Sequence, residues 1–163
     1  MKTHQIKIES LFEHYKDASE LGKEEQELIS KAREACNDAY APYSNFHVGS
    51  AILLMNGTVV TGNNQENAAY PSGLCAERVA IFAASATHKN VAIKTIAVAC
   101  KSPNFVICTP VTPCGACRQV IAEYQEKYNH PIRIIMTGEK GEVYACNGIE
   151  QLLPLMFNSK QLK

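Results

Sequence analysis

The order of apolar patterns along the chain is the feature that most restricts its fold. From residue 23 onward, segments with helical spacing of apolar side chains alternate with short apolar segments typical of strands. The expected order is a helix from 23, strands at 47–55 and 58–63, a helix at 75–86, a strand at 91–100, a helix from 113, strands at 132–137 and 143–146, and a short helix at 149–157. Strands joined through helices lie parallel in a covered sheet, so we predict an α/β fold. The expected architecture is a three-layer sandwich, with a mixed sheet of about five strands between helical layers.

The domain organisation follows from the length and from the uniform composition. The chain has 163 residues, which suits one domain with a substantial core, and no repeat or linker-like segment divides it. Residues 1–22 are polar and form an N-terminal extension of unknown role. They could be a short strand or helix packed on the domain, or a mobile arm. We assign residues 23–163 to a single domain.

Charge and hydropathy restrict the class of partner. The formal net charge at pH 7 is zero, so no overall field attracts nucleic acid or an anionic membrane. No apolar run approaches the roughly 20 residues that a membrane-spanning helix needs. Residues 1–17 lack the apolar core and cleavage site of a secretory signal. We therefore expect a cytoplasmic protein that binds neither nucleic acid nor membrane.

The cysteines divide into two groups. There are seven, and an odd number without an export signal argues against a disulfide framework. Cys36 and Cys100 lie in apolar patterns typical of a core, and Cys108 and Cys146 could also be core residues. The three that remain, in unusual local sequence, are Cys75, Cys114 and Cys117.

These three cysteines all lie at expected helix starts. Cys75 begins one helix, while Cys114 and Cys117 begin another directly after Pro113. A pair at i and i+3 can face one direction in the first turn of a helix. Because both helices follow strands, their N-termini open near the same sheet edge, where ligands bind in open α/β sheets. Three converging thiolates would supply three corners of a zinc tetrahedron and leave the fourth for water.

The residues that follow Cys75 fit such a site. Glu77 lies two residues from a ligand, where a carboxylate can take a proton from a metal-activated water and pass it to a leaving group. Three thiolates on Zn²⁺ leave a net charge of about −1. Arg78 could offset that charge by donating to a ligand sulfur, and Gln119 could donate in the same way.

Other interpretations of the same residues remain open. A lone C-x-x-C could be a redox pair, half of a structural zinc site or two core cysteines. Cys108 or Cys146 could supply the fourth ligand of a closed structural site. A glutamate in the first turn is favoured by the helix dipole alone. The redox interpretation explains neither Glu77 nor Cys75, whereas all the motifs together match the zinc-deaminase signature, in which His or Cys is the first ligand.

Several separated motifs extend this match. They are "YSNFHVGSAI", "GNNQENAAY", "CAERVAIF", "PCGACRQVI" and "LLPLMF", in this order between about residues 23 and 157. With them, the chain resembles the small homotetrameric cytidine deaminases that have a three-cysteine zinc site. The resemblance makes residues 23–163 the catalytic domain and leaves residues 1–22 outside it.

The resemblance implies an activity and a set of site residues. Cytidine and 2′-deoxycytidine would lose ammonia to give uridine and deoxyuridine, in pyrimidine salvage. Cys75, Cys114 and Cys117 match the ligands of one zinc ion per chain, and Glu77 matches the proton shuttle to N3 and to the departing amino group. Four further positions match contacts to the substrate: Asn64 and Glu66 to the ribose hydroxyls, Phe46 beside the pyrimidine, and the backbone of Ala76 to the base.

The resemblance also implies that neighbouring subunits complete each site. Phe157 matches an aromatic residue inserted from another chain toward the base, and Tyr70 lies in a segment that reaches across an interface. Each residue has a simpler interpretation. Phe157 could be an apolar C-terminal anchor, Phe46 a core residue, and Asn64 and Glu66 polar loop residues.

Three rival functions share parts of this pattern. A blasticidin-like deaminase shares the C-x-E and P-C-x-x-C motifs but is not expected to keep Phe46, Asn64, Glu66 and Arg78 together. A nucleic-acid deaminase typically has His as first ligand and needs a basic path for the strand, whereas this chain has Cys75 and a balanced net charge. A non-catalytic zinc-stabilised binding protein would have no need of Glu77.

Overall fold

The computed structural model describes residues 3–162. A six-stranded sheet with the order β1-β6-β5-β4-β2-β3 forms the centre of the molecule. Its strands are β1 (Glu13–Tyr15), β2 (His47–Leu54), β3 (Val59–Asn63), β4 (Ile93–Lys101), β5 (Arg133–Thr137) and β6 (Val143–Asn147). The α-helices are α1 (Lys23–Ala35), α2 (Ala76–Thr87) and α3 (Gly115–Tyr128). No helix in the described residues is long and apolar enough to cross a membrane.

The sheet is mixed, as the sequence predicts. β4 and β5 are parallel and are joined through α3, whereas the other neighbouring pairs are antiparallel. β2 and β3 form the hairpin expected around Asn56-Gly57, with Gly57 at φ 83°. The number of strands differs from the expected five, because part of the N-terminal extension adds β1 at the edge beside β6.

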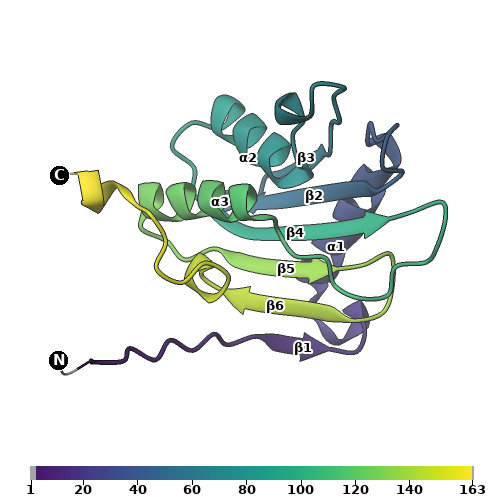
Figure 1. The fold of residues 1–163 in the computed structure, drawn as a ribbon. Helices are drawn as coiled ribbons and strands as arrows, with labels where there is room; N and C mark the ends of the chain where they lie inside the picture. Colours follow the sequence, from purple (N-terminus) through teal and green to yellow (C-terminus); the bar gives the residue numbers. More distant parts are fainter. Residues whose placement is uncertain (1–2, 163) are drawn as a thin grey trace.

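Helices cover both faces of the sheet, which confirms the three-layer architecture. α1 packs on one face and α2 and α3 on the other (Figure 1). Neighbouring residues of a strand point to opposite faces, so Ala51 joins the α1 side of the core and Ile52 the α2 side. A strand buried on both sides therefore has the continuous apolar run seen in β2 and β4.

A close backbone contact fixes the start of α2. A Cβ at Gly62 in β3 would lie 2.5 Å from the nitrogen of Ala80 and 2.8 Å from the oxygen of Ala76. Glycine therefore lets the first turns of α2 rest directly on β3. This contact determines where Cys75 stands relative to the sheet.

The prediction of a helix over 149–157 is wrong. The structure has only a 3₁₀ turn, η4 (Ile149–Gln151), followed by irregular chain. Pro154 has no N–H to continue a helix, and Leu155 takes a positive φ of 56°. Residues 152–158 instead form turns and irregular chain beside α3, where Arg118 and Gln119 donate hydrogen bonds to them.

Candidate active site

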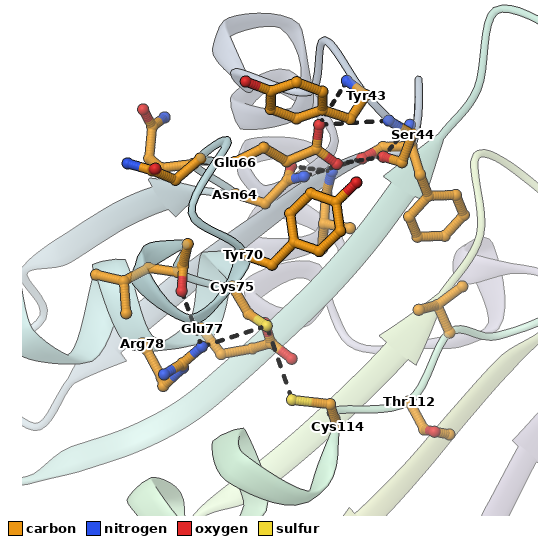
Figure 2. A pocket seen from close by; sticks show the side chains of 17 residues that line it. Tyr43, Ser44, Asn64, Glu66, Tyr70, Cys75, Glu77, Arg78, Thr112 and Cys114 are labelled. Atoms are coloured by element: carbon orange, nitrogen blue, oxygen red, sulfur yellow. Dashed lines mark hydrogen bonds between the residues drawn. The ribbon is translucent and has the colours of Figure 1, made fainter.

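The two helices on one face of the sheet both begin at a cysteine. Cys75 is the N-cap residue of α2 and Cys114 that of α3, and neither side chain caps its helix. β3 and β4 run in the same direction with β2 between them, so the chain leaves both strands at the same end of the sheet. The sulfur of Cys75 lies 3.7 Å from that of Cys114 (Figure 2). The sulfur of Cys114 lies 3.6 Å from that of Cys117.

The spacing of the three sulfurs fits a zinc ion. Sulfurs at about 2.3 Å from a tetrahedral zinc are about 3.8 Å apart, close to the distances found. Among residues 3–162, these cysteines are the one group of three or more candidate ligands, with all sulfurs within 4.8 Å. Cys108 and Cys146 do not belong to this group, so the alternative of a closed structural site with either as fourth ligand has no support in this arrangement. A three-sulfur group leaves one corner open.

Hydrogen bonds around Cys75 favour the thiolate, which is the form that binds a cation. Hydrogen bonding from Cys117, Arg78 and Cys114 holds the pKa of the Cys75 thiol well below its usual range. The pKa of Cys117 is raised in turn, by its hydrogen bond to Cys75 and by burial. Nη2 of Arg78 lies 3.8 Å from the Cys75 sulfur, and its buried Nε has no hydrogen-bond partner among the described residues. The guanidinium thus lies beside the Cys75 sulfur.

Glu77 is a buried acid beside the open corner. It lies in the first turn of α2 with 4% of its surface exposed. Burial, and then the nearby charge of Cys75, raises the pKa of its carboxyl. Glu77 lines a cavity of about 830 Å³ together with Cys75 and Cys114. A carboxylate in this position can exchange a proton with a molecule bound in the cavity.

The far end of the cavity carries a polar cluster from two loops (Figure 2). The carboxylate of Glu66 accepts hydrogen bonds from the main-chain nitrogens of Tyr43 (2.8 Å) and Ser44 (3.3 Å) and from the Ser44 hydroxyl (2.5 Å). The amide of Asn64 donates to the oxygen of Phe46 (2.9 Å) and accepts from the nitrogen of Val48 (2.7 Å). These bonds fix both polar side chains at the cavity wall.

The remaining predicted residues lie at different depths. Phe46 and Tyr70 line the cavity, and the Tyr70 ring meets that of Tyr43 edge-on at 6.3 Å. Ala76, the first residue of α2, is fully buried and its side chain does not line the cavity. Phe157 does not line this cavity, and its main-chain oxygen accepts a hydrogen bond from Gln119 (2.8 Å). Gln119 therefore donates to the C-terminal segment rather than to a sulfur.

Sequence reasoning missed several residues that shape the site. Tyr43, Ser44 and Thr112 line the cavity, and Arg118 holds the main chain beside Cys114. Tyr43 and Ser44 act through contacts with a residue distant in sequence, Glu66, so spacing alone carries no signal of them. The two-residue separation of Ser44 and Phe46, whose nitrogen donates to the Ser44 hydroxyl, is the one local hint.

Comparisons with known proteins agree with this site. The model of the "Cytidine and deoxycytidylate deaminase zinc-binding region" matches residues 22–129. The cytidine deaminase of Sporosarcina psychrophila is 39% identical over 137 residues, covering 84% of this chain and 93% of the relative. The crystal structure of cytidine deaminase from Burkholderia pseudomallei is similar with a TM-score of 0.70 and 38% identity, over 80% of this chain and 97% of that one. That from Mycobacterium tuberculosis has a TM-score of 0.62 and 30% identity, over 81% and 95%.

A helix-covered mixed sheet, with three thiols and a buried acid at its open cavity, defines the class of zinc-dependent deaminases. With the matches above, the chain belongs to the cytidine deaminase family.

Proposed function

We propose that this protein catalyses the hydrolytic deamination of cytidine and 2′-deoxycytidine to uridine and deoxyuridine, as a step of pyrimidine salvage. The observation that carries the proposal is the three-sulfur group with the buried carboxylate of Glu77 beside it, in one cavity with Asn64 and Glu66. The reaction consumes one water and releases one ammonia per nucleoside.

The thiolates of Cys75, Cys114 and Cys117 would hold one Zn²⁺ per chain. When bound there, the metal would lower the pKa of a water and make it nucleophilic at neutral pH. Arg78 reduces the excess negative charge of three thiolates by facing the Cys75 sulfur.

Glu77 carries the protons of the reaction. Its carboxylate accepts one proton from the attacking water and delivers it to N3 of the pyrimidine. It then accepts the second proton of that water, from the new hydroxyl on C4, and delivers it to the departing amino group. Burial raises its pKa, which brings the carboxyl closer to the protonation equilibrium that a proton carrier needs at neutral pH.

The other end of the cavity binds the nucleoside. Glu66 accepts hydrogen bonds from the ribose hydroxyls, since its loop bonds leave lone pairs on the carboxylate. Asn64 can both donate to and accept from these hydroxyls, since its loop bonds leave one amide proton and a lone pair. Phe46 offers an apolar face to the pyrimidine, and the backbone at Ala76 contacts the base.

We further propose a homotetramer in which neighbouring copies complete each cavity. Tyr70 is 78% exposed and Phe157 is 55% exposed, and both are large side chains with apolar surface to bury. Residues 23–163 would form the catalytic domain, with residues 1–22 as an extension. All seven cysteines are free, which is consistent with the reducing cytoplasm.

The deciding experiment follows the ultraviolet absorbance of cytidine with purified, zinc-assayed protein. A Glu77→Gln variant with the same zinc content is the control. Loss of the cytidine signal with the unmodified protein alone supports both the reaction and the role of Glu77. No loss at one zinc per chain would contradict the proposal and redirect the search to other aminopyrimidines or to a binding role.

A further inference from the structure

Arg118 joins the metal-binding loop to the C-terminal segment. It lies on α3, one turn after Cys114. Its Nε donates to the oxygen of Pro113 (2.7 Å), and Nη2 donates to the hydroxyl of Thr112 (3.3 Å). Its Nη1 donates to the oxygen of Leu152 (2.7 Å), far along the chain. One planar side chain therefore binds three acceptors from two separate segments.

The segment that Arg118 holds is the one that presents Cys114. Pro113 and Thr112 directly precede this cysteine, which is exposed and makes no side-chain bond to cap α3. The loop before them is irregular, with exposed residues over most of its length. The hydrogen bond to Pro113 is thus a main restraint on the approach of the chain to Cys114.

The same helix binds the C-terminal segment at two further points. Gln119 donates to the oxygen of Phe157, and the carboxylate of Glu126 accepts from the nitrogen (3.3 Å) and hydroxyl (2.9 Å) of Ser159. Between the attachments at Leu152 and Phe157, the side chain of Leu155 is 87% exposed. The strap over residues 152–159 is therefore fastened along α3, with its first attachment at Arg118.

We propose that Arg118 is a positioning residue that holds Cys114 in its metal-binding geometry and braces it against the C-terminal strap. The proposal rests on the zinc site proposed above. Arg118 donates to main-chain and hydroxyl oxygens beside the ligand and to no sulfur, so its role differs from that of Arg78. Residues that orient a metal ligand in this way typically change metal affinity about 10- to 100-fold when mutated.

The test measures zinc release from the purified holoenzyme into a chromogenic chelator. Arg118→Met, which keeps the aliphatic stem but removes all three donors, should release zinc at least about tenfold faster than the unmodified protein. Arg118→Lys should fall between them, because one ammonium cannot reproduce the planar fork. With excess zinc, the kcat of both variants should return to within about threefold of the unmodified value, since the side chain does not touch the reacting groups.

The matched control is Glu126→Gln, which weakens the strap at Ser159 and leaves every bond of Arg118 in place. Its zinc release should equal that of the unmodified protein. Unchanged release from Arg118→Met would overturn the proposal, as would equal acceleration by Glu126→Gln. If Arg118→Met does not fold, as judged by thermal unfolding, Arg118→Lys decides by the same criterion. Failure of the unmodified protein to bind zinc would instead contradict the proposed function.

Discussion

The two ends of the cavity are built in different ways. The end that carries the three clustered cysteines and Glu77 is the proposed metal end. There Glu77 is 4% exposed and Cys117 is fully buried, and the cysteines stand at the starts of helices that pack against the sheet. The end that carries Asn64 and Glu66 is the proposed sugar end. There Tyr43 is 51% and Tyr70 is 78% exposed, and the two polar side chains stand on loops. All three candidate ligands of the metal end therefore come from one chain, whereas the sugar end is exposed and depends on loop hydrogen bonds. Mutations at the two ends should differ in size and in kind.

The largest effect is expected from Cys114→Ala at the metal end. Two thiolates cannot hold zinc as three do, so the variant should lose the metal and all measurable turnover, and its melting temperature should fall toward that of the metal-free protein. Zinc analysis and thermal unfolding with and without a chelator check this. Cys108→Ala is the matched control, because this exposed thiol lies outside the sulfur group and should change neither result. Retention of a full zinc complement by Cys114→Ala would remove this cysteine from the site.

Glu77→Gln should separate chemistry from metal binding at the same end. The amide keeps the shape of the side chain but cannot carry protons, so kcat should fall by about 10²- to 10⁴-fold. Zinc content and melting temperature should stay near those of the unmodified protein. Steady-state kinetics and zinc analysis check this, and near-normal turnover would end the assignment of Glu77 as proton carrier.

The sequence predicts the metal end better than the rest of the molecule, for a physical reason. Cys75, Glu77, Cys114 and Cys117 act through local spacing at helix starts, and the strands before them have clear apolar runs. The position of α2 depends on Gly62, because only a residue without a side chain lets the helix touch β3 there.

Elements that depend on distant partners could not be predicted. β1 is only Glu-His-Tyr, with no apolar alternation, and it is held at the sheet edge by Arg133. The guanidinium donates to both oxygens of Glu13 (2.6 and 2.7 Å) and to Glu25 (3.0 Å). Likewise, the segment from Leu152 to Phe157 is not helical. Its main-chain oxygens at these two residues accept hydrogen bonds from Arg118 and Gln119 of α3. No sequence period records such pairs.

Glu66→Ala should show that the sugar end contributes binding alone. It removes a charged acceptor for the ribose hydroxyls, so kcat/KM for cytidine should fall by roughly 10- to 100-fold. Zinc content should not change, because Glu66 lies at the opposite end of the cavity (Figure 2). The measurement compares cytidine with free cytosine, which lacks the sugar and should lose little. An equal fall in kcat/KM for cytidine and cytosine would contradict the assignment of Glu66 to the ribose.

The smallest and most specific effect is expected from Ser44→Ala. The Ser44 hydroxyl and the main-chain nitrogens of Tyr43 and Ser44 lower the pKa of Glu66, with the hydroxyl as the largest cause. A lowered pKa keeps the carboxylate ionised, and able to accept from ribose, until the pH falls below the usual glutamate range. Without the hydroxyl the pKa of Glu66 rises back toward the ordinary glutamate range, so KM for cytidine should begin to increase at a higher pH on acidification.

KM profiles between about pH 4 and pH 7 test this shift, since they span the range where an ordinary glutamate is protonated. At neutral pH the same variant should lose only roughly three- to tenfold in kcat/KM, the usual size of one lost hydrogen bond. Tyr43→Phe is the matched control, because Tyr43 contacts Glu66 through its main-chain nitrogen and its hydroxyl can be removed without changing that bond. The rise of KM at low pH should therefore begin at a higher pH in Ser44→Ala than in Tyr43→Phe. Identical KM profiles would mean that Ser44 does not lower the pKa of Glu66. A shift confined to Ser44→Ala, with zinc content unchanged, would show that the sugar end is set by loop hydrogen bonds independently of the metal end.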